Sequence, residues 1–182
     1  MDVQPTEIPD IKLITPRKFG DARGFFSETY SRQRLREIGI DVEFVQDNHS
    51  LSGPAGTVRG LHYQAPPFAQ AKLVRVSRGS VLDVAVDIRE GSATFGRHVA
   101  VELSAKNWRQ LYIPPGFAHG YCTLEPDTEV QYKVSTAYAP DSEFGIRWDD
   151  AALGIDWRIA GEPTLSDKDK ANPLFADAPR HF

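Results

Sequence analysis

Cysteine is almost absent from the sequence, because Cys122 is the only one among 182 residues. A single thiol cannot form an intrachain disulfide, and it excludes a zinc site built from several cysteines. Disulfides are typical of secreted domains and rare in reducing compartments. We therefore expect a protein of the cytoplasm.

Long apolar runs and blocks of like charge are missing as well. No stretch approaches the roughly 18 apolar residues of a membrane helix, and Met1–Ile14 lacks the basic start and apolar run of a signal peptide. The chain has 21 Lys and Arg against 25 Asp and Glu, a formal net charge of −4. This balance gives no electrostatic basis for extended binding to nucleic acid or an anionic membrane, although single basic residues can bind one phosphorylated ligand. We expect neither partner.

What remains is an ordinary globular composition, with 41% hydrophobic and 25% charged residues. Neither a low-complexity tract nor a linker interrupts it, so we expect the whole chain to fold. A chain of this length suits one hydrophobic core. The sequence predicts a single domain over residues 1–182.

Strand and turn signals alternate along most of the chain. Short segments rich in Val, Ile, Phe and Tyr are bounded by Gly, Pro, Asn and Asp, which is typical of an all-β fold and favours a jelly roll or other antiparallel barrel. The predicted strands are Phe25–Tyr30, Phe44–Ser50, Val58–Tyr63, Lys72–Ser77, Val81–Ile88, His98–Leu103, Gln110–Ile113, His119–Leu124 and Glu129–Val134.

Helix signals are few. Ser31–Ile38 is predicted as one short helix, with Ser31 as its N-cap and Gly39 beyond its end. The SDKD segment, Ser166–Asp169, has the pattern of a capping box at the start of a second helix. Both helices are expected at the periphery of the barrel.

Alternation along one strand predicts that Lys72 faces the interior. Lys72 shares its face with Val74 and Val76, because side chains two positions apart lie on the same side of a sheet. A buried lysine loses hydration and needs either an anion or a lowered pKa. A structural ion pair with Asp83 or Asp87 accounts for it as well as a catalytic role does.

The same test places Tyr132 inward with Val130 and Val134. Taken alone, it fits a core aromatic with a bonded hydroxyl. In RGLHYQ, alternation places His62 on a polar face of little bulk with Gly60 and Gln64. The opposite face then holds Arg59, Leu61 and Tyr63. Such a face fits a ligand cavity, while a lone histidine also fits a structural hydrogen bond.

The segment PPGFAHGY, Pro114–Tyr121, places a rigid turn just before His119 and resembles the second half of the cupin signature. In metal-binding cupins the first half supplies two histidines one residue apart and a glutamate. Here the corresponding residues are His62-Tyr63-Gln64, and neither His49 nor His98 supplies the missing ligand. We therefore expect no metal.

Eight segments, in order, resemble the deoxythymidine-diphosphate-4-dehydrorhamnose 3,5-epimerases, a family of cupin-type jelly-roll enzymes. The resemblance runs nearly end to end, with two departures, Arg158 where proline is usual and His49 after QDN. The segments are DARGFFSETY (Asp21–Tyr30), FVQDNHS (Phe44–Ser50), VRGLHYQ (Val58–Gln64), AQAKLVRVSRGSVLDVAVDIR (Ala69–Arg89), SATFG (Ser92–Gly96), YIPPGFAHGY (Tyr112–Tyr121), VQYKVSTAYAP (Val130–Pro140) and LSDKD (Leu165–Asp169).

The resemblance implies four catalytic residues. His62 corresponds to the general base and Asp169 to the carboxylate that pairs with it, Tyr132 corresponds to the general acid, and Lys72 would lie near the C4 ketone oxygen. It also implies substrate contacts, the arginines and Lys168 with the nucleotide diphosphate and the others with nucleotide or sugar. These are Arg23, Glu28, Gln46, Asn48, Arg59, His119, Glu143 and Lys168.

Purely structural roles stay open for several of these residues. Arg23 and Arg59 could form marginal surface ion pairs, and Asp169 could serve as a helix cap as well as a catalytic group. Asp83 could orient His119 or neutralise the buried lysine.

The resemblance further implies an isomerase that inverts C3 and C5 of dTDP-4-dehydro-6-deoxy-D-glucose to give dTDP-4-dehydro-L-rhamnose. Such an enzyme needs no cofactor. The resemblance also implies a homodimer, because in the family the segment holding Arg23 reaches a neighbouring subunit's site. The alternatives are a single-centre epimerase or 3,4-ketoisomerase of a related nucleotide sugar, a metal-dependent cupin oxygenase and a non-catalytic sugar-nucleotide binding protein.

Overall fold

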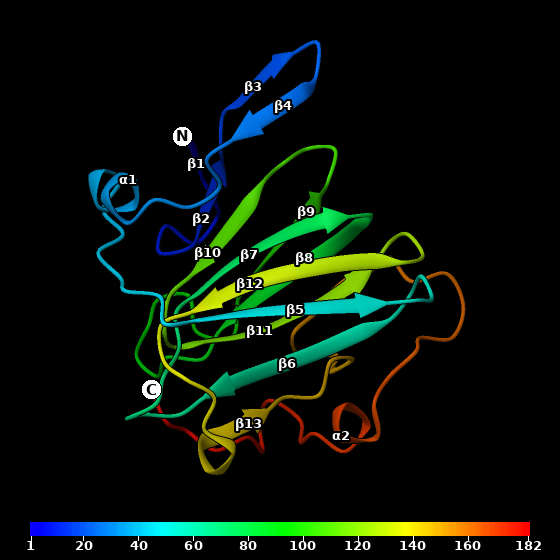
Figure 1. The fold of residues 1–182 in the computed structure, drawn as a ribbon. Helices are drawn as coiled ribbons and strands as arrows, with labels where there is room; N and C mark the ends of the chain where they lie inside the picture. The colour runs from blue at the N-terminus through cyan, green and yellow to red at the C-terminus, as the bar shows by residue number, and fades with distance from the viewer.

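Two antiparallel sheets packed face to face form the body of the protein in a computed structural model that describes residues 1–182 (Figure 1). The six-stranded sheet contains, in spatial order, β1 (Asp2–Pro5), β2 (Lys12–Thr15), β10 (Gln110–Ile113), β7 (Lys72–Arg78), β12 (Thr128–Val134) and β5 (Gln46–Ser52). The five-stranded sheet contains β13 (Glu143–Gly145), β6 (Val58–Gln64), β11 (Phe117–Thr123), β8 (Ser80–Asp87) and β9 (His98–Ser104). The predicted all-β jelly roll is confirmed.

A separate hairpin of β3 (Lys18–Asp21) and β4 (Gly24–Ser27) projects from this body, at the top of Figure 1. The predicted strand Phe25–Tyr30 is wrong at its end, because pairing stops at Ser27. Trp108 holds the base of the hairpin, where its indole N–H donates to the Ser27 hydroxyl at 2.9 Å and its ring meets Phe25 edge to face.

The short helices lie where they were predicted. Helix α1 (Arg32–Glu37) begins after Ser31, whose hydroxyl accepts from the Arg34 backbone N–H. Helix α2 (Asp167–Lys170) begins after Ser166, which accepts from the Asp169 backbone N–H. A single 3-10 turn, η1 (Pro140–Ser142), precedes β13. No helix has the length and apolar character needed to span a membrane.

Apolar side chains fill the space between the sheets and also cover the outer faces. Val74, Val76 and Val130 belong to the cluster between the sheets, as alternation predicts. On the outside, the C-terminal segment covers the five-stranded sheet with residues such as Ile146 and Trp157. Because both of its faces are covered, every residue of β8 is buried.

Four short strands, β1, β2, β3 and β13, have no counterpart in the sequence prediction. Strands of three or four residues are too short to display the alternation on which the prediction depends. Longer central strands were predicted within one or two residues, and β10 was predicted with its observed bounds.

Candidate active site

Two hollows lie side by side at the open edge of the jelly roll, between the sheets. One has a volume of about 430 Å³ and contains Arg59, His119 and Asp169. The second has a volume of about 320 Å³ and contains Gln46, Asn48 and Glu143. Both are lined by His62, Lys72 and Tyr132. The structure therefore brings the three residues together where the hollows meet.

His62 forms a close pair with Asp169. Its Nε2 lies 2.5 Å from Asp169 Oδ1, and the carboxylate is only 4% exposed. The other carboxylate oxygen accepts a hydrogen bond from the Ser166 hydroxyl at 2.9 Å. Burial acts to raise the pKa of Asp169, but the hydrogen bonds and the charge of His62 lower it overall. The remaining ring nitrogen of His62 has no partner within the chain and is available to a ligand.

Lys72 is a partly buried cation without an ion pair. Its ammonium donates a long hydrogen bond of 3.5 Å to the carbonyl oxygen of His62. Burial lowers the pKa of Lys72 to about 8, and the charges of Asp83 and Glu143 oppose that shift. Asp87, one of the partners considered above, is bonded to Arg89 instead.

Tyr132 approaches the cavity from the six-stranded sheet, whereas His62 approaches from the five-stranded sheet. Burial raises the pKa of the Tyr132 phenol, with Arg59 opposing and Glu143 adding to the shift. Its hydroxyl therefore stays protonated at neutral pH. A neutral phenol on one wall and an imidazole on the other can donate and accept protons on two sides of a bound molecule.

The prediction that Arg59 faces away from His62, made from strand alternation, is wrong. The pairing of β6 with β11 shifts register, so that the four residues of β6 from Arg59 to His62 oppose the three residues of β11 from His119 to Tyr121. The extra residue turns Arg59 to the same face as His62, and both line the cavity. The shift is at Gly60, which has φ +126°, and a Cβ there would lie 2.5 Å from Gly120 Cα. Arg59 then donates hydrogen bonds to Ser52 and to the Leu51 carbonyl.

His119 lies directly opposite His62 in the strand pairing and is bonded to Asp83. Burial is the main cause that lowers the pKa of His119. Of the two roles left open for Asp83, the direct contact is with His119, while its effect on Lys72 acts only through charge.

The second hollow has a chain of polar contacts at its mouth. Gln46 donates to Asn48 at 2.8 Å. Glu143 accepts from the Tyr138 hydroxyl at 2.7 Å and forms an ion pair with Lys168. Tyr138 is 57% exposed despite its size, and a flat exposed ring at a cavity mouth can stack on a base or sugar.

Comparison with known proteins assigns the family. The family model described as dTDP-4-dehydrorhamnose 3,5-epimerase matches residues 5–177. The chain belongs to this family. A relative named dTDP-4-dehydrorhamnose 3,5-epimerase, from Shigella flexneri, is 52% identical over 98% of this chain and 98% of its own length.

Two solved epimerase structures share the fold. The 3,5-epimerase of Legionella pneumophila, in complex with dTDP-4-keto-L-rhamnose, is 45% identical with a TM-score of 0.94 over 100% of this chain and 98% of its own. The dTDP-4-dehydrorhamnose 3,5-epimerase of Bacillus anthracis, with TDP and PPi bound, is 50% identical with a TM-score of 0.93, covering 95% of this chain and 98% of its own.

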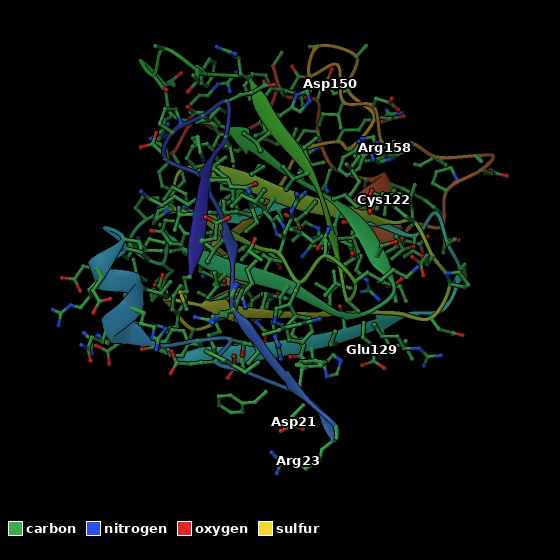
Figure 2. All side chains as sticks on the ribbon, turned by 90° about the horizontal axis from the view of Figure 1, so that it is seen from above. Asp21, Arg23, Cys122, Glu129, Asp150 and Arg158 are labelled. Atoms are coloured by element: carbon green, nitrogen blue, oxygen red, sulfur yellow. The ribbon has the colours of Figure 1, made fainter.

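Two of the residues expected to bind substrate in this epimerase lie away from the cavity. Arg23 is at the tip of the projecting hairpin, 89% exposed and paired with Asp21 (Figure 2). Glu28 pairs with Arg34 and lines a separate hollow of about 460 Å³ on the outer face of the six-stranded sheet. Within one chain Arg23 lies apart from His62, Lys72 and Tyr132, whereas the hollow that Glu28 lines also contains Tyr132.

Among the cavity residues that sequence reasoning missed are Tyr138 and a bonded pair of hydroxyls. Ser50 Oγ and the Tyr121 hydroxyl lie 2.8 Å apart, and both line the first hollow. Tyr121 follows His119 by two positions on one strand, so alternation could have placed it on the same face.

Proposed function

We propose that this chain inverts C3 and C5 of dTDP-4-dehydro-6-deoxy-D-glucose, giving dTDP-4-dehydro-L-rhamnose, with His62, Lys72, Tyr132 and Asp169 as its catalytic residues. The observation that supports this assignment is the placement of an imidazole and a phenol on opposite sheets, with a buried ammonium where the two hollows meet. Family membership supports the reaction and the substrate.

The reaction begins with removal of a proton from carbon. A C–H bond next to a ketone is acidic because the carbanion spreads its charge onto the ketone oxygen. In the proposal, the free ring nitrogen of His62 takes the proton, and Asp169 stabilises the imidazolium that forms. The carboxylate also fixes the orientation of the ring, since the other nitrogen is bonded to it.

Lys72 then stabilises the enolate. Its ammonium has no competing anion in contact, and partial burial reduces its hydration, so its charge acts strongly on a developing oxyanion. Tyr132 donates a proton from the opposite wall, and the carbon is inverted. His62 then releases its proton to solvent and Tyr132 regains one from solvent, after which the same exchange can take place at the second centre.

The residues proposed to contact the substrate form two groups, one positively charged and one polar. Arg59 and Lys168 carry positive charge at the cavity and suit the diphosphate, which a guanidinium can bind through two hydrogen bonds. Gln46, Asn48, His119 and Glu143 line the hollows and suit hydroxyl and base groups. Binding the remote nucleotide helps to orient the sugar.

A homodimer in the cytoplasm completes the proposal, with Arg23 and Glu28 serving the neighbouring subunit. The projecting hairpin supports this arrangement, since Phe19, Phe25 and Phe26 are each about half exposed or more. Exposed aromatic rings gathered on one hairpin typically mark a contact surface.

The test follows hydrogen exchange by proton NMR with dTDP-4-dehydro-6-deoxy-D-glucose in deuterated water. We expect deuterium at C3 and C5 and accumulation of the rhamnose product. His62→Ala should lose both exchange and product. Tyr132→Phe should lose product. Exchange at only one carbon would favour a single-centre epimerase, and exchange that persists in His62→Ala would contradict the assignment of the base.

A further inference from the structure

A buried carboxylate next to the cavity takes no part in the proposed mechanism. Asp83 on β8 has no exposed side-chain surface. Val81 and Ala85, the residues two positions away on the same face, belong to the apolar core between the sheets. An ionised carboxylate in such surroundings is costly unless it is bonded. Its presence therefore calls for a role beyond packing.

His119 is the hydrogen-bond partner of that carboxylate. Its Nε2 lies 3.0 and 3.1 Å from the two oxygens of Asp83. The strand pairing explains the contact, because Asp83 opposes Tyr121 and is thus the diagonal neighbour of His119 on the inner face. An ionised carboxylate only accepts hydrogen bonds, so Nε2 carries a proton.

The surroundings of His119 favour the neutral form of its ring. Burial lowers the pKa of His119, Lys72 and His62 lower it further, and Asp83 opposes them. A neutral imidazole has one N–H, and here that N–H is at Nε2. Nδ1 then holds a lone pair, and it has no hydrogen bond within the chain.

Several polar groups in this part of the cavity are already engaged or can only donate, and Asp169 already accepts from His62 and Ser166. Lys72 and Arg59 are donors only. The free nitrogen of His62 is engaged with the carbon acid in the proposed mechanism, and Ser50 and Tyr121 bond each other. Nδ1 of His119 therefore offers a sugar hydroxyl near the reacting carbons an acceptor that has no partner within the chain.

We infer that Asp83 is a positioning residue: it fixes His119 with its N–H turned away from the cavity, so that Nδ1 accepts a hydrogen bond from a hydroxyl of the bound sugar. The inference rests on the proposed function and deepens it. Its rival is that Asp83 serves Lys72 through its charge alone.

The direct test is the tautomer of His119 in the full chain without ligand. Ring nitrogens of the ¹⁵N-histidine-labelled protein are observed by long-range proton–nitrogen NMR and assigned with His119→Gln. We expect the Nε2–H form at pH 7 and a change towards the Nδ1–H form in Asp83→Asn, whose amide can donate to Nε2. An Nδ1–H or doubly protonated ring in the unaltered chain would overturn the inference.

Kinetics separate His119 from Lys72 as the group through which Asp83 acts. We expect Asp83→Asn to raise KM about tenfold with little change in kcat, as loss of a contact made equally in ground and transition states does. Adding Asp83→Asn to His119→Gln should then cost nothing further. Additive losses, or a fall in kcat at constant KM, would favour the rival.

The inference can still be tested if the variant does not fold or if the chain exchanges no hydrogen. If Asp83→Asn does not fold, dTDP-L-rhamnose is added to the labelled unaltered chain, and the Nδ1 resonance of His119 should move to lower frequency as it accepts a hydrogen bond. An unchanged resonance in the bound protein would overturn the inference. A chain with the Nε2–H ring that exchanges neither C3 nor C5 hydrogen would refute the proposed function and leave the tautomer standing.

Discussion

Lys72, in its proposed role, would be useful to catalysis and unfavourable to folding. Its pKa is lowered from 10.5 to about 8 by burial. The folded chain therefore gives up this proton at a lower pH than the unfolded chain does. The cost of burying the charge is present in full below pH 8, and stability from this group increases as pH rises towards 10.5.

Replacing the charge should expose this conflict. We expect Lys72→Met to lower kcat by about 10²–10³, because the enolate loses its cation. The same change should raise the free energy of unfolding at pH 7 by about 1–2 kcal/mol, because an unpaired buried charge is removed. Solvent-exchange NMR and urea unfolding measure the two effects.

Lys106→Met is the matched control, since that side chain is 87% exposed. It should change neither kcat nor the free energy of unfolding.

In the unaltered enzyme kcat/KM should also fall above about pH 8 as Lys72 loses its proton. A less stable Lys72→Met protein would show that the ammonium stabilises the fold, contrary to this account.

At the scale of the element, α2 is a helix of four residues that carries Asp169, the carboxylate proposed to pair with the base. Ser166 caps it by accepting from the Asp169 N–H at 3.1 Å, and its hydroxyl donates to the Asp169 carboxylate. The Ser166 side chain thus starts the helix and contacts the carboxylate that is bonded to His62, the proposed base. The capping-box pattern predicted the helix, while its contact with β6 depends on the tertiary fold.

Ser166→Ala should therefore lose both stability and activity. We expect about 1 kcal/mol less free energy of unfolding, as for other N-cap serines. We also expect kcat to fall several-fold, because Asp169 loses a hydrogen bond that orients it. Urea unfolding and the epimerisation rate are the measurements.

The control comes from the other helix of the chain. Ser31 caps α1 in the same way but has no contact with the cavity. Ser31→Ala should cost similar stability and leave kcat unchanged. Equal losses of activity in the two variants would mean that Ser166 acts on the reaction only through folding.

At the scale of the whole molecule, a single chain separates Arg23 from the cavity that it is proposed to serve. Figure 2 shows Arg23 pointing outward from the end of the hairpin. Its only partner in the chain is Asp21, and such exposed pairs add little to stability. A second copy of the chain would give the guanidinium a diphosphate to bind.

Hybrid dimers test this arrangement. Arg23→Ala and His62→Ala should each be nearly inactive alone. When both variants are produced together, half the dimers are mixed, and one site in each mixed dimer has both residues intact. We expect about a quarter of the wild-type rate in the exchange assay. No recovery in mixed dimers, confirmed by mass spectrometry, would place Arg23 outside the shared site.

The sequence by itself determined features that arise within one strand or one turn. Alternation placed Lys72 and Tyr132 inward, because side chains two positions apart share a face whatever the neighbouring strands are. Ser31 and Ser166 began the two helices, since capping depends on three or four consecutive residues. The all-β class followed from the spacing of strand and turn signals.

The tertiary structure decided the features that depend on pairing between distant segments. His62 and Asp169 are 107 positions apart, and their contact requires α2 to pack on β6. Arg59 reaches the cavity only because β6 gains a residue against β11, which strand alternation alone cannot reveal. Asp83 had two possible partners until the register of β8 and β11 placed it beside His119. Local residue patterns set which way a side chain points from its own strand, but cross-strand register sets what it meets.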